Sequence, residues 1–305
     1  MVTPILSRGS LTQMLVDSMP RTTCRMLAFY DSSIDAVITD PAYMRISVTD
    51  KLVEGWAVFD TCNLYSGHLY QLDSHLGRLL KSAELAKIPA PMTIKEMASK
   101  VSQLLEFADS DFCRVRLLLS RSRNFEVESS VFYALAYTDP AQSKPLTVKE
   151  VTVSVPVKPK ELAIIKSNSY LINSLCVMEA RDKGGYMGIQ LDENNCLAES
   201  AIANVAVLLP GGHFRTPKPD AVLEGTTLKR VFEYCQGLIG TEELQSVERE
   251  NVSYEEVLQS QEMMFLGGDS CIGIVELDSK PIGDGKLGKL TQKIQRFLEG
   301  DRLES

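Results

Sequence analysis

Lys166 is the first of three places in the sequence where side chains could act on a small molecule. It ends the apolar, strand-like run 162–165 and precedes a helical pattern that carries Leu171, Leu175 and Met178. Burial of such a run would favour the uncharged amine that imine chemistry requires. The alternative is a surface lysine whose stem lies along apolar neighbours.

Glu199 is the second candidate. It follows a turn at 192–195 and stands just ahead of an apolar strand pattern. A carboxylate in that place could keep a pyridine nitrogen protonated, so that the ring withdraws electrons from a bound substrate. The alternative is a solvated loop acid.

The third candidate is the run Gly225, Thr226 and Thr227 at the start of a helical pattern. Backbone N–H groups, hydroxyls and the positive end of a helix together suit a phosphate. The alternative is an ordinary threonine N-cap.

The elements that must position these residues fall into two groups. In the N-terminal part, alternating apolar residues predict strands at 42–48, 58–72, 115–121 and 131–137, and helical spacing predicts helices at 73–88 and 93–108. This is an α+β domain. A polar stretch with two prolines, 139–150, then indicates a boundary. We therefore expect an N-terminal domain at 1–141, a linker at 142–150 and a C-terminal domain at 151–305.

The C-terminal part also mixes strands and helices. Strands are predicted at 151–157, 186–192 and 204–210, and helices at 170–183, 226–238, 254–263 and 287–298. All three candidate sites lie in this part of the chain.

Composition excludes several classes of partner. The net charge is −8 and the charges of both signs are interspersed, so no basic stripe is available for nucleic acid. The three histidines lack ligand spacing, so we expect no metal site. Seven single cysteines suggest reduced thiols inside a cell. No apolar run approaches the roughly 20 residues of a membrane span, so we expect no membrane partner.

The first 26 residues contain three arginines against one acid and are rich in serine and threonine. We expect an ordinary flexible leader and a cytoplasmic protein. The alternative is the remnant of an organelle transit segment, and hence a plastid or a mitochondrion.

The order of these features resembles the class IV aminotransferases, a family of pyridoxal-phosphate (PLP) enzymes that includes D-amino-acid transaminase, branched-chain aminotransferase and aminodeoxychorismate lyase. The likeness runs from about Val58 to Leu290. It rests on LDSHLGRLLKSA, KSNSYLINSLCVMEARDKGG, LDENNCLAESAIANVAVL, GTTLKRV and the PIGDG core of the tail.

The resemblance implies a fold type IV architecture, with a small α+β N-terminal domain and a larger C-terminal domain that contains a barrel-like sheet. It also implies a homodimer and roles for individual residues. Lys166 matches the lysine that forms the Schiff base. The residues implied in cofactor binding are Arg78, for the phosphate, and Lys166, Tyr170, Glu199, Gly225, Thr226, Thr227 and Ser270.

The sequence departs from the family pattern at three places. Small hydroxyl residues are usual just after the acidic partner, whereas here Ala201–Ala203 follow Ser200. A Thr-Gly-Thr-like phosphate loop is expected before the tail, but the matching stretch 265–270 contains Asp269, whose charge would repel a phosphate unless it turned away. Trp56 stands where smaller residues are usual.

Substrate choice depends on loops of the first domain. Tyr170 lies four residues after Lys166, a spacing that favours the D-amino-acid and lyase branch over the branched-chain enzymes. Arg121 and Arg123 fall where D-amino-acid transaminase binds the substrate carboxylate, and Phe59 would form an apolar pocket wall.

The function implied is a ping-pong transamination between an amino acid, of the D type by preference, and a 2-oxo acid. Branched-chain L-amino-acid transamination and aminodeoxychorismate lyase activity are the enzymatic alternatives. An inactive protein with the PLP fold is the non-enzymatic one, and Asp269 together with Ala201–Ala203 favours it.

Overall fold

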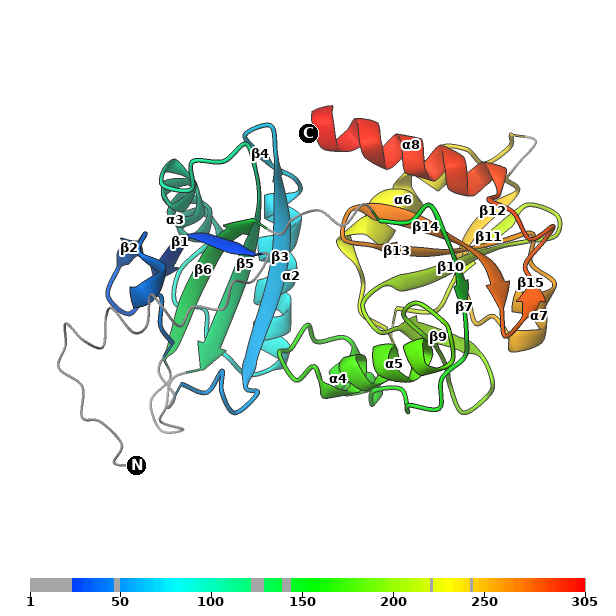
Figure 1. The fold of residues 1–305 in the computed structure, drawn as a ribbon, viewed down its shortest axis with the longest axis horizontal. Helices are drawn as coiled ribbons and strands as arrows, with labels where there is room; N and C mark the ends of the chain where they lie inside the picture. Colours follow the sequence, from blue (N-terminus) through cyan, green and yellow to red (C-terminus); the bar gives the residue numbers. More distant parts are fainter. Residues whose placement is uncertain are drawn as a thin grey trace, which may run out of the picture. The chain divides into compact units, whose positions relative to one another are not determined.

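The chain forms two units, Met1–Gln142 and Ser143–Ser305, in the computed structural model (Figure 1). The structure describes residues 24–46, 50–121, 129–138, 144–219, 222–241 and 244–304. Arg123 and most of the N-terminal leader lie outside the described residues.

Unit 1 is built on a six-stranded antiparallel sheet with the order β2-β1-β6-β5-β3-β4. Its strands are β1 (Arg25–Asp31), β2 (Ala36–Ile38), β3 (Ala57–Tyr65), β4 (His68–Leu69), β5 (Phe112–Arg121) and β6 (Ser130–Thr138). Along β3 buried residues alternate with partly exposed ones from Val58 to Leu64. One face of the sheet is therefore core and the other is not.

Helices α2 (Leu72–Leu85) and α3 (Ile94–Glu106) pack against the sheet of unit 1 (Figure 1). The apolar residues that recur at helical spacing in α2, Leu76, Leu79 and Ala83, are all buried. Helix α3 begins with a capping box between Thr93 and Glu96.

Three features of unit 1 differ from the prediction. The strand expected at 42–48 is wrong over its described part, because Pro41–Tyr43 form the short 3-10 helix η1 and the Asp40 side chain accepts a hydrogen bond from the Ala42 backbone N–H. Strands β1 and β2 were not predicted. The segment 58–72 contains a turn between β3 and β4 rather than one strand.

Unit 2 contains a seven-stranded sheet with the order β12-β11-β10-β13-β14-β15, and β7 pairs in parallel with β14. The strands are β7 (Thr147–Glu150), β10 (Asn204–Leu209), β11 (His213–Thr216), β12 (Ser246–Arg249), β13 (Glu262–Gly267), β14 (Ser270–Leu277) and β15 (Lys280–Pro281). A separate hairpin is formed by β8 (Ile189–Leu191) and β9 (Leu197–Ser200). Strand β7 lies within the stretch 142–150 that the sequence predicts as a linker.

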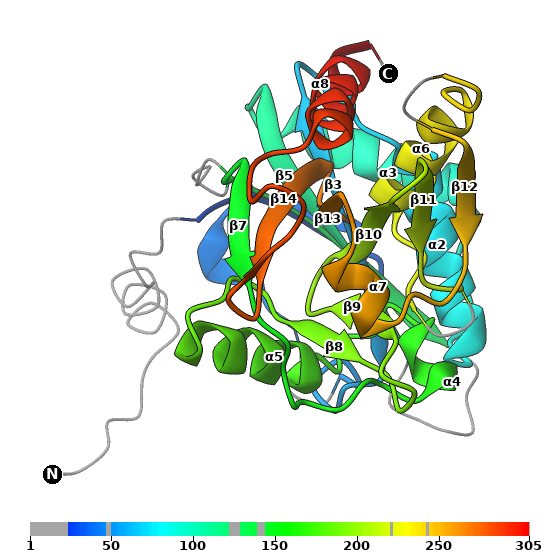
Figure 2. The ribbon, with the colours of Figure 1, turned by 90° about the vertical axis from the view of Figure 1, so that its right-hand side faces the viewer.

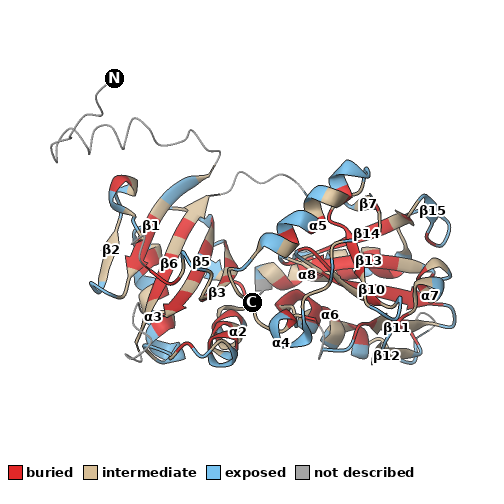
Figure 3. Cartoon of the chain, turned by 90° about the horizontal axis from the view of Figure 1, so that it is seen from below, coloured by how far each residue is buried: buried red, intermediate tan, exposed pale blue. Residues whose placement is uncertain are grey.

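Both faces of this sheet are covered (Figure 2). On one face, alternate residues of β10 and β13 pack with the β8–β9 hairpin and α7 (Tyr254–Leu258). On the other, the intervening residues pack with α6 (Thr226–Gln236) and α8 (Lys289–Glu304). Strand β10 is therefore buried throughout (Figure 3), which explains its unbroken apolar sequence.

Three predicted elements of unit 2 are wrong. The run 162–165 is not strand-like, since its first two residues belong to α4 (Lys160–Ala163) and Ile164 is the C-cap residue of that helix. The segment 151–157 is extended but makes only one isolated bridge, between Thr152 and Ile189. The helix expected at 254–263 ends at Leu258, and β13 begins at Glu262. Helix α5 (Leu171–Asp182) agrees with its prediction closely.

No helix in the described part of the chain is long and apolar enough to cross a membrane. Across the same residues, no group of three or more histidine, cysteine or acidic side chains is placed to hold a metal ion.

Candidate active site

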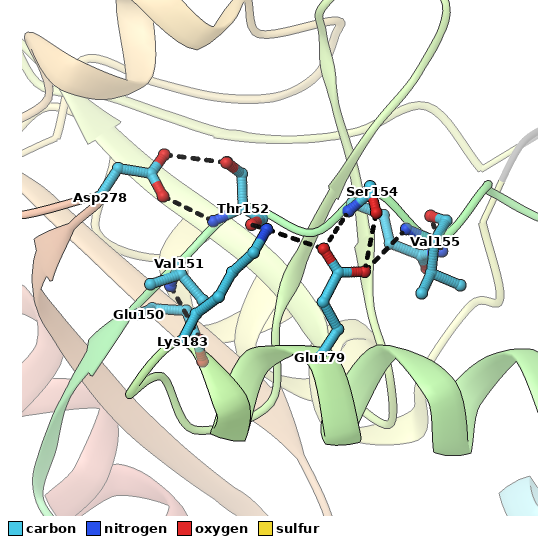
Figure 4. A network of polar contacts seen from close by, with 9 residues as sticks. Glu150, Val151, Thr152, Ser154, Val155, Glu179, Lys183 and Asp278 are labelled. Atoms are coloured by element: carbon cyan, nitrogen blue, oxygen red, sulfur yellow. Dashed lines mark hydrogen bonds and ion pairs between the residues drawn. The ribbon is translucent and has the colours of Figure 1, made fainter.

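Three carboxylates fix the extended segment of unit 2 that leads to the candidate lysine (Figure 4). Glu179 on α5 accepts hydrogen bonds from the Ser154 N–H at 2.8 Å, the Ser154 hydroxyl at 3.1 Å and the Val155 N–H at 3.2 Å. Its carboxylate also pairs with Lys183 at 2.7 Å. The hydrogen bonds from Lys183 and Ser154 lower the pKa of Glu179 to about 2.

The other two carboxylates, Asp278 and Glu150, bind the chain just before Ser154. Asp278 accepts from the Thr152 N–H at 2.8 Å and the Thr152 hydroxyl at 3.0 Å. Glu150 is buried and accepts three backbone N–H groups, those of Val151 at 3.0 Å, Tyr186 at 3.1 Å and Met187 at 2.8 Å. Side chains thus supply the hydrogen bonds that a strand partner would supply in a sheet.

Lys166 lies three residues after the end of α4 and is partly buried. Tyr170 is the N-cap residue of α5, so one short loop carries both residues. The start of α5 is held in turn by Asn173, whose side-chain amide donates to the Ala201 carbonyl.

Glu199 lies on β9 and is partly buried rather than solvated. Burial raises its pKa to about 7, although the positive charges of Lys158 and Lys166 and a hydrogen bond from the Leu223 backbone oppose the rise. A carboxyl group with such a pKa can exchange a proton with a basic nitrogen near neutral pH. Lys166 and Glu199 therefore lie near enough for their charges to interact.

Lys158 is a second lysine beside Glu199 that the sequence reasoning missed. Its ammonium lies 5.8 Å from the centre of the Tyr170 ring, on one of its faces. Burial lowers the pKa of Lys158, and the charge of Glu199 acts against that shift. The sequence offered one signal for Lys158, which is that a charged residue stands between Pro156 and Pro159 in an otherwise apolar stretch.

The candidate phosphate turn begins helix α6. Gly225 is its N-cap residue and offers no side-chain cap, while Thr226 and Thr227 are buried. Asn204 on β10 joins this turn to the sheet, because its carbonyl accepts from the Gly225 N–H at 3.1 Å and its amide donates to the Leu223 carbonyl at 2.7 Å. A side chain at position 225 would collide with Asn204.

The turn between β13 and β14 contacts the same helix end. The Asp269 N–H donates to the Thr227 hydroxyl at 3.0 Å. A Cβ atom added to Gly267 would lie 3.1 Å from that of Ala203. The Ser270 hydroxyl donates to the Gly267 carbonyl and accepts from Lys144 at 2.8 Å. The turns at 200–204, 225–227 and 267–270 therefore meet in one corner of unit 2.

Arg78 lies in unit 1 and is held by a fully buried carboxylate. Its Nε and Nη2 atoms donate to the two oxygens of Asp60 at 2.7 and 2.8 Å, and His75 Nδ1 lies 2.8 Å from Asp60 Oδ1. Burial alone would raise the pKa of Asp60, but the hydrogen bonds from His75 and Arg78 outweigh it and hold that pKa well below its usual range. Asp60 thus fixes the direction of the Arg78 guanidinium.

Two of the predicted substrate residues of unit 1, Arg121 and Phe59, pack against neighbouring side chains. The Arg121 guanidinium lies 5.1 Å from the centre of the Trp56 ring and donates to the Lys87 carbonyl, so the large Trp56 side chain supports an arginine. Phe59 lies on the β3 face away from the core, and the guanidinium of the exposed Arg116 lies 5.3 Å from its ring. Arg116 was not predicted. Arg123 lies outside the described residues.

Comparison with known proteins places these features in a family. The family model described as "Amino-transferase class IV" matches residues 57–277. The chain is 34% identical over 310 residues to a D-amino-acid transaminase, chloroplastic, from Arabidopsis thaliana, covering 98% of this chain and 82% of the relative. It is 23% identical to a putative branched-chain-amino-acid aminotransferase from Methanocaldococcus jannaschii, covering 89% and 96%.

Solved structures show the same fold. A branched-chain aminotransferase from Thermoproteus uzoniensis, solved with norvaline, gives a TM-score of 0.80 at 20% identity and covers 90% of this chain and 94% of its own. The branched-chain enzyme from Escherichia coli gives a TM-score of 0.80 at 19% identity, with the same coverage.

Proposed function

Because this chain belongs to the class IV aminotransferase family of PLP enzymes, we propose that it moves the amino group of a D-amino acid to a 2-oxo acid by a ping-pong mechanism. The family, the fold type IV architecture and the cofactor expected from the sequence are confirmed. The stereochemistry of the donor and the roles of individual residues are parts of the proposal.

The residues of unit 2 fit the cofactor. A lysine, a carboxyl group with a pKa near 7 and a helix N-terminus without a side-chain cap match its aldehyde, its ring nitrogen and its phosphate respectively. When bound, PLP supplies an aldehyde that captures amines and a ring that withdraws electrons from the substrate α carbon.

Lys166 and Glu199 would control two protons, that of the substrate α carbon and that of the cofactor ring nitrogen. Lys166 Nζ would link to the cofactor aldehyde and, once a substrate amine displaces it, carry a proton to and from the substrate α carbon. Glu199 would keep a proton on the ring nitrogen. The observation that carries the proposal is that Glu199 is partly buried and lies near enough to Lys166 for the two charges to interact.

The phosphate would be held at the start of α6. Thr226, Thr227 and the first N–H groups of α6 would contact it in unit 2, with Ser270 beside them. The family resemblance also assigns Arg78 to the phosphate, a role that suits a guanidinium group. Tyr170 would contact the ring side of the cofactor.

Preference for a D-amino acid is supported by the 34% identical relative, which is named a D-amino-acid transaminase. A further relative, 25% identical over 257 residues, is named D-alanine aminotransferase and comes from Bacillus licheniformis. The four-residue spacing from Lys166 to Tyr170 supports the same branch. Arg121 and Arg123 are the proposed carboxylate-binding residues, and Phe59 the proposed wall of the pocket.

Branched-chain L-amino-acid transamination is the second candidate, supported by the names of several relatives and structural neighbours. A relative from Bacillus subtilis named aminodeoxychorismate lyase, 29% identical over 60% of this chain, supports the lyase alternative more weakly.

The test of the central claim is the visible absorbance of the purified protein saturated with PLP. We expect a band from the lysine–cofactor linkage that Lys166→Ala abolishes. Lys160→Ala is the matched control, because Lys160 is an exposed lysine of the neighbouring helix α4. A wild-type protein without the band, or a band that survives Lys166→Ala, contradicts the proposal.

The test of substrate class is a screen of D-alanine, L-leucine and aminodeoxychorismate as donors, with pyruvate or 2-oxoglutarate as acceptor. We expect turnover with D-alanine to exceed turnover with L-leucine. Pyruvate release from aminodeoxychorismate without an acceptor would instead support the lyase.

We also propose that the protein is a homodimer, as the family resemblance implies. For localisation the cytoplasm is our first expectation. The relative named chloroplastic supports the plastid alternative.

A further inference from the structure

The turn between β13 and β14 has a backbone conformation that few residue types adopt. Gly267 pairs with Ser270, so Gly268 and Asp269 are the two residues of a tight hairpin turn. Both have positive φ, +55° and +59°. This is the conformation of a type I′ turn, in which glycine, asparagine and aspartate are tolerated and β-branched residues are strained.

Asp269 is buried where this turn meets helix α6. The residue is only 2% exposed, and its N–H lies 3.0 Å from the hydroxyl of Thr227, in the first turn of the helix. Because covalent geometry ties a carboxyl group closely to its own backbone nitrogen, the Asp269 carboxyl lies within about 7 Å of that hydroxyl. The carboxyl group is therefore a neighbour of the N-terminus of α6.

The N-terminus of a helix favours one anion, and a second anion beside the first is repelled. The Asp269 carboxylate would therefore repel a phosphate bound at the N-terminus of α6. A cation already lies at this turn, since the Lys144 ammonium donates to the Gly268 carbonyl at 2.5 Å and to the Ser270 hydroxyl at 2.8 Å. Lys144 is exposed, so solvent screens its charge.

The turns at 200–204, 225–227 and 267–270 together form what we call the phosphate corner. We propose that Asp269 is a specificity-determining residue of this corner and that its carboxylate lowers the affinity of the chain for the phosphate of its cofactor. The inference rests on the proposed function, because it takes Thr226 and Thr227 as phosphate ligands. PLP is then held chiefly through Lys166 and the contacts of its ring, and the phosphate adds less affinity than an uncharged turn would allow.

The experiment compares PLP with pyridoxal, which has the same aldehyde and ring but no phosphate. Dissociation constants of both are measured by absorbance titration of the lysine-linked cofactor, in the wild type and in Asp269→Asn. We expect the variant to bind PLP at least about tenfold more tightly and pyridoxal with unchanged affinity. Asp269→Gly accepts the same backbone conformation and should behave alike.

Asp109→Asn is the matched control. Asp109 is exposed and also has a positive φ, +41°, so solvent screens its charge and the same substitution should alter neither constant. Equal changes for PLP and pyridoxal, or no change for PLP in either Asp269 variant, would overturn the inference. If the wild type bound neither compound through Lys166, the proposed function itself would fail.

Discussion

At the scale of single residues, the state of Glu199 depends on two opposing effects. Burial favours its protonated form, and the neighbouring Lys158 and Lys166 favour the carboxylate, which leaves its pKa at about 7. A group balanced in this way can respond to a basic ring nitrogen by giving up its proton.

We therefore predict that Glu199→Gln binds PLP but reacts slowly. A glutamine keeps the size of the side chain and cannot stabilise a protonated ring nitrogen, so the half-reaction with the amino donor should slow by about 2 kcal/mol or more, roughly 30-fold. Stopped-flow absorbance of the bound cofactor gives this rate. Unchanged half-reaction rates would refute the role of Glu199, and the exposed Glu193 of the preceding turn supplies a control as Glu193→Gln.

Sequence reasoning found Glu199 and Lys166 through the order of motifs, since neither residue is distinctive alone. It missed Lys158, because no motif marks that position and only the fold shows which carboxylate the lysine faces. It also gave no sign that Asp60 would hold Arg78, since eighteen positions and a change from strand to helix separate them.

At the scale of elements, the segment 151–157 makes one bridge to Ile189 of β8 and is otherwise held mainly by carboxylates. Glu150 is the most buried of these acids, and it ties this segment to the loop before β8 through three backbone N–H groups. The chain that leads to Lys158 and Lys166 thus depends on side chains for its position.

Glu150→Ala should consequently lower the free energy of unfolding by about 3 kcal/mol or more, because it leaves three backbone donors without their acceptor. Chemical denaturation measures the change, and hydrogen exchange should speed up at Val151, Tyr186 and Met187. Lys149→Ala, at the exposed neighbour, should change stability by less than about 0.5 kcal/mol. Equal effects from both substitutions would argue against the anchoring role.

Elements with a clear apolar stripe were predicted well, as α2 and α5 show. The prediction was wrong at 254–263 because no glycine or proline interrupts the chain between Leu258 and Glu262. The turn from α7 to β13 depends instead on partners far along the chain, such as the Leu290 and Thr291 N–H groups that Glu262 accepts. The segment 151–157 has strand-like residues but pairs with strand β8 only through the bridge between Thr152 and Ile189, which a sequence pattern cannot reveal.

At the scale of the whole molecule, two buried carboxyl groups make stability depend on pH in opposite directions. The folded state lowers the pKa of Asp60, so its contribution is complete above the unfolded value of 3.8 and is lost as the pH falls further. The folded state raises the pKa of Glu199 from 4.5 to about 7, so its contribution is complete below 4.5 and is lost as the pH rises to 7.

For the protein without cofactor, we predict that Glu199 makes stability fall by up to about 3 kcal/mol between pH 4.5 and 7. Urea denaturation of the wild type and of Glu199→Gln at several pH values isolates this contribution as the difference between the two proteins. Parallel stability curves for both proteins would show that Glu199 is ionised normally in the folded state.

The positive φ of Asp269 limits which substitutions evolution can accept at this position of the phosphate corner. The threonine of the expected loop is β-branched and would be strained at +59°, so that substitution alone costs stability. Asparagine accepts this backbone, has no charge, and is separated from aspartate by a single base change in the genetic code. Random mutagenesis under selection for growth at scarce vitamin B6 would reach it in one step, whereas threonine would require the turn to be rebuilt first.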